Sequence, residues 1–204
     1  TYDIALRKQA AGLMGKSRNG RTRVQQLLTD NKVPDDILTE IKGTPATTNP
    51  QAITSGTVTL NELLTLTADA KNGKAVFNKS CFICHQVNNE GLDFGPKLSE
   101  IGSKLPKESL LENIIHPSAG ISFGYETWEL AMKDGSTMTG IISSKTSTDI
   151  TLKYPGGTSE TVKTSNVKSM KELKNSMMPE GLQQTMSRQD LADLLEYLAS
   201  LKKS

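Results

Sequence analysis

The stretch Cys81-Phe82-Ile83-Cys84-His85 contains both cysteines and one of the two histidines of this 204-residue chain. On a helix, Cys81, Cys84 and His85 would lie at positions i, i+3 and i+4 and would project from one face. Two thiols placed there can add to the two vinyl groups of a single haem while the imidazole reaches the iron. This spacing is the attachment motif for c-type haem. The sequence therefore predicts one covalent haem c on Cys81 and Cys84, with His85 as an iron ligand.

Three other interpretations of the same residues remain open. A redox-active dithiol normally occurs in a thioredoxin-like βαβ context, and the residues around 70–100 show no such pattern. A structural zinc ion needs about four ligands, but only His116 and carboxylates are left to add to the three. A disulfide between Cys81 and Cys84 would leave His85 without a role.

Motifs on both sides of the cysteines occur in a recognisable order. They are Gly73 and Phe77 upstream, Gly95-Pro96-Lys97-Leu98 and Met177-Met178-Pro179 downstream, and a closing helix with Leu194-Leu195-Glu196-Tyr197-Leu198. This order resembles a class I cytochrome c, which has an N-terminal helix, the haem-attachment motif, a Gly-Pro-x-Leu loop, an axial methionine and a C-terminal helix that crosses the first. The resemblance implies a mainly α cytochrome c fold around the haem.

Residues from about 60 to 204 are more specifically similar to the planctomycete-type haem-binding domain, which is fused at the C-terminus of large bacterial dehydrogenases of the PQQ and sugar type. The shared motifs are Pro117-Ser118-Ala119, Gly124-Tyr125-Glu126, Asp134-Gly135, Gly140-Ile141 and Met178-Pro179-Glu180-Gly181-Leu182. This resemblance implies a redox partner protein or a fused dehydrogenase domain that supplies the electrons.

The resemblance also assigns the rest of the iron site. Met178 is expected to be the second axial ligand, because it precedes a proline in a loop just ahead of the last helix. Met177 is its nearest rival, and His116 is the chemical alternative. The carbonyl oxygen of Pro96 is expected to accept a hydrogen bond from the free ring nitrogen of His85, which would fix the imidazole plane.

Composition narrows the choice of partners and compartment. The formal net charge is only +2, so nothing favours nucleic acid or an anionic membrane as the main partner. No apolar run approaches the roughly 18 residues that a membrane span requires. Covalent haem attachment of this kind takes place outside the cytoplasm, so we expect a periplasmic or otherwise exported protein. The start at Thr1 is consistent with a processed chain or an excised domain.

Hydrophobic periodicity divides the chain into three parts. Residues 1–42 read as a helical, repeat-like segment, and residues 43–59 have the Thr, Pro, Asn and Gly composition of a linker. Residues 60–204 form the predicted cytochrome c haem domain. Within it, alternating apolar residues and turn signals predict a small inserted β-sheet or barrel of four or five strands at about 125–170.

Two classes of function follow. The first is electron transfer by the haem, from a dehydrogenase domain or partner towards the respiratory chain, in a module that is not itself an enzyme. The second is a haem enzyme or sensor of peroxidase type with a labile sixth ligand. The sequence shows no distal Arg–His pair to support the second class.

Overall fold

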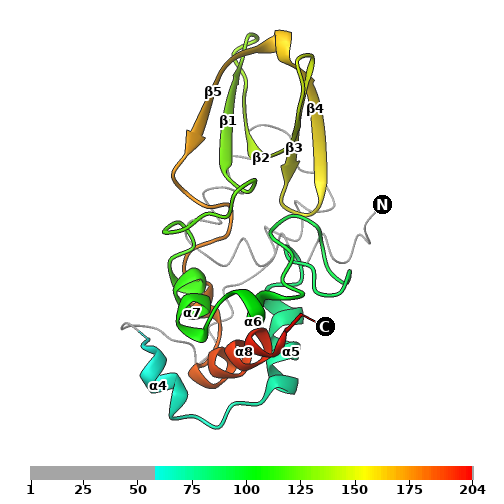
Figure 1. The fold of residues 1–204 in the computed structure, drawn as a ribbon. Helices are drawn as coiled ribbons and strands as arrows, with labels where there is room; N and C mark the ends of the chain where they lie inside the picture. The colour runs from blue at the N-terminus through cyan, green and yellow to red at the C-terminus, as the bar shows by residue number, and fades with distance from the viewer. Residues whose placement is uncertain (1–57, 204) are drawn as a thin grey trace, which may run out of the picture.

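The computed structural model describes residues 58–203, and it contains a group of helices and a five-stranded sheet (Figure 1). The predicted helical segment at 1–42 and nearly all of the predicted linker at 43–59 lie outside the described residues. The helices are α4 (Leu60–Leu64), α5 (Ala70–Ser80), α6 (Ile101–Lys104), α7 (Lys107–Ile115) and α8 (Arg188–Ser200), with 3₁₀ turns η1 (Thr164–Asn166) and η2 (Leu182–Thr185). No helix in this part of the chain is long and apolar enough to cross a membrane.

Helices α5 and α8 pack closely, as the first and last helices of the resembled fold should. A Cβ added at Gly73 would lie 2.0 Å from the carbonyl oxygen of Asp193 and 2.7 Å from Cβ of Tyr197. Only a glycine therefore permits this approach. One turn further along α5, the rings of Phe77 and Tyr197 lie tilted with centroids 5.6 Å apart. These contacts confirm the expected crossing of the closing helix over the first.

The ends of the helices follow from their capping residues. The side chain of Ser187 accepts a hydrogen bond from Asp190 N–H, and the Asp190 side chain accepts one from Ser187 N–H, which is a capping box at the start of α8. Helix α4 begins with the same arrangement between Thr59 and Glu62. Each box satisfies two backbone groups at a helix start that would otherwise lack a partner.

The inserted strands form one antiparallel sheet. They are β1 (Thr127–Met132), β2 (Thr137–Lys145), β3 (Asp149–Tyr154), β4 (Thr158–Lys163) and β5 (Val167–Leu173), in the order β4-β3-β2-β1-β5. The two end strands, β4 and β5, do not pair with each other, so the insertion is an open sheet and not a closed barrel. Because five strands stand beside the helices, the expectation of a mainly α fold is met only in part.

The sheet has a hydrophobic core of its own. Alternate side chains of all five strands meet on one face, among them Leu130, Ile150 and Leu152, which are completely buried. This cluster is separate from the helical core. The strand register shifts at Ala131/Met132 and at Ile142/Ser144, and such bulges increase the bend of a strand. The bend allows this small open sheet to curve around its own apolar face.

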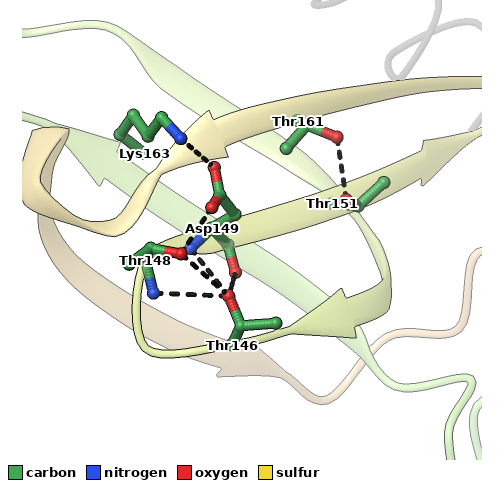
Figure 2. Close-up of polar contacts among 6 residues, drawn as sticks. All are labelled: Thr146, Thr148, Asp149, Thr151, Thr161 and Lys163. Atoms are coloured by element: carbon green, nitrogen blue, oxygen red, sulfur yellow. Dashed lines mark hydrogen bonds and ion pairs between the residues drawn. The ribbon is translucent and has the colours of Figure 1, made fainter.

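Turn chemistry fixes the hairpins. At the predicted turn, Gly135 has φ +90° and Ser136 N–H donates to Asp134 Oδ1 at 2.9 Å. Figure 2 shows the β2–β3 turn, where Thr146 Oγ1 accepts from Asp149 N–H at 2.9 Å, and Lys163 Nζ reaches Asp149 Oδ1 at 2.7 Å. The hydrogen bonds that Lys163 Nζ and the Thr148 hydroxyl donate to the Asp149 carboxylate hold the pKa of this group below its usual value.

Candidate haem-binding site

The attachment stretch follows directly on helix α5. The helix ends at Ser80, and Cys81 to Cys84 form a turn, so the prediction of a regular helix through these residues is wrong. The shared face survives in the turn, because His85 N–H donates to the Cys81 carbonyl at 2.9 Å, an i to i+4 bond. Cys81, Cys84 and His85 all line one pocket. The helix stops here because the Phe77 carbonyl accepts from the N–H groups of both Cys81 and Phe82.

The loop that follows folds back over this turn. The Cys84 carbonyl accepts from Gly95 N–H at 2.6 Å and from Phe94 N–H at 3.2 Å, and the Phe82 carbonyl accepts from Leu92 N–H at 3.0 Å. The side chains of Leu92 and Phe94, which belong to this loop, are buried. The loop is therefore held by backbone bonds to the very residues that carry the predicted ligands.

His85 is fixed by its neighbours at Gly95 and Pro96. Its Nδ1 lies 2.7 Å from the Pro96 carbonyl oxygen. A carbonyl can only accept, so Nδ1 carries the proton and Nε2 keeps a lone pair that is free to bind iron. Burial lowers the pKa of the His85 imidazole, and the bond to Pro96 partly offsets that effect. A neutral imidazole is the form that binds a metal.

Gly95 provides the space that the imidazole occupies. A Cβ added at Gly95 would lie 2.7 Å from Cε1 of His85 and 3.0 Å from its Nδ1. Real Cβ atoms essentially never come so close to another heavy atom, so the ring would have to move. Gly95 therefore leaves room for the ring, and the Pro96 carbonyl oxygen fixes its orientation.

The two cysteines are partly buried in the same apolar pocket and do not form a disulfide. Burial raises the pKa of both thiols to about 12. A reactive dithiol needs a lowered thiol pKa, so these surroundings do not favour that alternative. Within residues 58–203, no group of three or more His, Cys, Asp or Glu side chains is arranged to hold a metal ion.

The methionine loop also contributes to the lining of the pocket. This loop connects β5 to η2, and its residues Met177, Met178 and Pro179 line the pocket. Met178 packs against the helical core and is partly buried. The structure thus brings both candidate methionines to the pocket that holds His85. His116, the alternative ligand, is exposed at the end of α7 and does not line this pocket.

The sheet borders the pocket as well. Ile141 of β2 and Pro155 of the β3–β4 turn belong to its lining. Lys153 Nζ lies 3.2 Å from Asp93 Oδ2 and 3.1 Å from the Asp93 carbonyl, so β3 is tied to the loop that carries Pro96. Figure 1 shows the lower ends of β3 and β4 above this loop. Lys153 and Asp93 are 60 residues apart in the sequence, so no local pattern predicts that they interact.

Comparison with known proteins agrees with this geometry. Residues 70–152 match the family model described as Cytochrome c. No curated protein matches the chain. The matched residues run from α5 into β3, so they include the attachment stretch and Pro96 but not Met178.

The match supports a c-type cytochrome with haem, iron and haem-based electron transfer. The residues present fit that cofactor, because the pocket is apolar and presents two thiols, one imidazole with a free Nε2 and two thioethers. A haem held in this way exchanges electrons with another redox centre, so a redox partner is implied.

Proposed function

We propose that this protein is an electron-transfer module with one haem, covalently attached through Cys81 and Cys84, whose iron is bound by His85 and Met178. The observation that carries the proposal is the single apolar pocket lined by all four residues, in which Pro96 holds the His85 ring with Nε2 free. The bound haem would supply one-electron exchange. The role of the protein is to orient the two axial side chains and to keep water away from the iron.

The choice of ligands fits an electron acceptor. One thioether and one imidazole give a haem a higher reduction potential than two imidazoles do. Two protein ligands also fill both axial positions, which leaves no open position for oxygen or peroxide. The module therefore carries electrons and does not itself act on a substrate.

The electron donor is proposed to be a dehydrogenase, either fused to this haem domain as in the planctomycete-type proteins or docked on it, and the electrons then pass towards the respiratory chain. Support comes from the order of motifs in residues 60–204 and from the sheet between the two ligand loops. Because haem attachment of this kind takes place outside the cytoplasm, the protein is proposed to be periplasmic or otherwise exported.

Mass spectrometry of the denatured protein tests the covalent attachment. We expect the mass of the polypeptide plus one haem, since thioether bonds survive denaturation. Replacing both Cys81 and Cys84 with Ala should return the mass of the bare chain. A wild-type protein that shows only the polypeptide mass would contradict the attachment.

An optical spectrum of the ferric protein tests the axial pair and separates the two classes of function. Met–iron ligation gives a weak band at the red end of the visible range, and Met178→Ala should abolish it while Met177→Ala, the matched control, retains it. The reverse pattern would assign the ligand to Met177. A high-spin spectrum of the wild type would favour a haem enzyme or sensor.

A further inference from the structure

We propose that Thr127 and Ser118 are positioning residues for Met178, and that through them the inserted sheet braces the methionine loop against the haem pocket. The inference rests on the proposed function, because it takes Met178 as the axial ligand. It gives the sheet a role that neither the motifs nor the family match assigns to it.

Thr127 provides the first part of the brace. It is the first residue of β1, and its side chain is completely buried. Its Oγ1 donates to the carbonyl oxygen of Asn175 at 2.6 Å. Thr127 is itself held from both sides, because it pairs with Ile141 of β2 and with Leu173 of β5. The start of the methionine loop is therefore tied to an interior strand of the sheet.

Ser118 provides the second part. Its Oγ accepts from Ser176 N–H at 3.1 Å and lies 3.4 Å from Glu180 Oε1. Ser176 Oγ in turn accepts from Met178 N–H at 3.1 Å. Ser118 follows the buried Pro117 at the end of α7. The backbone N–H of Met178 is thus linked through two hydroxyl groups to the connection between α7 and β1.

The two contacts act on one short loop. Residues 174–181 run from β5 to η2, and the brace reaches them at Asn175 and Ser176, just ahead of Met178. Met178 packs against the helical core, which is separate from the hydrophobic core of the sheet, so these hydrogen bonds and not a shared core join the loop to the sheet. Hydrogen bonds that restrict it reduce the conformational entropy lost when the thioether binds. A looser loop would give up the iron more easily to a competing ligand.

Imidazole provides a direct measure of that competition. We would titrate the ferric, haem-loaded full chain with imidazole and follow the loss of the Met–iron band. Thr127→Val keeps the shape but removes the hydroxyl, and Ser118→Ala removes the second contact. In each variant, the loss of one such hydrogen bond should raise the apparent affinity for imidazole by about threefold to tenfold. Thr127→Ser, which restores a hydroxyl, should return the affinity close to that of the wild type.

The sheet offers a matched control at Thr161. Its hydroxyl lies 2.8 Å from that of Thr151 (Figure 2), and its strand β4 is at the opposite edge of the sheet from β5, which leads into the methionine loop. Thr161→Val removes a threonine hydroxyl from the same sheet and should leave the imidazole affinity unchanged. If Thr127→Val does not fold, Ser118→Ala tests the brace alone, because it alters a partly exposed loop position.

The outcomes separate this inference from the function on which it rests. Wild-type imidazole affinity in folded Thr127→Val and Ser118→Ala would overturn the brace while leaving Met178 as the ligand. An equal shift in Thr161→Val would overturn it too, since the effect would then be a general loosening of the sheet. A wild-type protein without any Met–iron band would overturn the proposed axial pair and, with it, the brace.

Discussion

Gly95 and Pro96 act on His85 in different ways, one through its lack of a side chain and the other through its carbonyl oxygen. The oxygen holds Nδ1 at 2.7 Å and selects the tautomer with Nε2 free. The glycine allows the loop to lie against the ring, where a methyl group would come within 2.7 Å of Cε1. The sequence singled out Pro96 by resemblance, but the space needed at Gly95 becomes visible only when the loop is folded.

Gly95→Ala should therefore disturb the imidazole. The added methyl group must displace either the ring or the loop, and overpacking of this kind costs about 1–3 kcal/mol. We expect a lower midpoint in urea unfolding of the haem-loaded protein and a ferric spectrum with an increased high-spin fraction. Gly73→Ala is the control, because its added Cβ would meet Asp193 and Tyr197 of α8 and not His85. It should also lower the unfolding midpoint but leave the ferric spectrum unchanged. A wild-type ferric spectrum in Gly95→Ala, or an equal high-spin fraction in both variants, would contradict this role.

At the scale of the elements, one buried carboxylate joins the first and last helices of the haem domain. Asp193 of α8 is almost fully buried and accepts from Asp69 N–H at 2.8 Å, Asn72 Nδ2 at 2.6 Å and Gln189 Nε2 at 2.8 Å. Two of these donors lie at the start of α5, where the helix dipole favours a negative charge. Asp193 therefore helps to fix the position at which α8 crosses α5, beside Gly73.

Asp193→Ala should reduce the stability of this helix pair. Its removal leaves buried donors without a partner, and we expect the free energy of unfolding to fall by about 2–4 kcal/mol. Urea unfolding of the haem-loaded chain, followed by circular dichroism, measures the change. Glu196→Ala on the same helix is the matched control. It removes only a partly exposed ion pair with Lys107 and should cost less than about 1 kcal/mol.

At the scale of the whole molecule, the charges nearly cancel. Residues 43–204 contain 16 Lys and Arg against 17 Asp and Glu. Attraction between nearly neutral bodies is weak and is screened beyond roughly 8–10 Å at physiological salt. Efficient encounter with a donor then needs tethering, which raises the effective concentration, or apolar contact. This agrees with a haem domain that is fused to its donor or docked tightly on it.

Small redox ions of opposite charge test this electrostatic expectation. Stopped-flow rates with the anion hexacyanoferrate and with the cation hexaammineruthenium should each change by less than about threefold from low to high salt, because the haem domain lacks a strong field. A change of tenfold or more with one of the two ions, in the direction that its charge dictates, would instead indicate a charged patch around the haem that steers its partner.

Local chemistry determined what could be predicted from the sequence. The spacing of Cys81, Cys84 and His85 brings them into one turn whether or not the helix continues. These residues therefore line one pocket even though α5 ends at Ser80 and does not continue through them as was predicted. The alternation of apolar residues and the Asp134-Gly135 turn indicated the strands in the same way, because a period of two and a turn residue are properties of adjacent positions. The capping box at Ser187 is equally local.

The tertiary structure alone decided how the sheet meets the pocket. Lys153 reaches Asp93, Thr127 reaches Asn175 and Ser118 reaches Ser176 across separations of 48 to 60 residues. Lysine, serine and threonine are common on surfaces and in turns, so nothing in their own neighbourhoods marks these residues. Their partners depend on strand register and on the path of two loops. The sequence indicates the candidate haem ligands, whereas the fold determines what holds them in position.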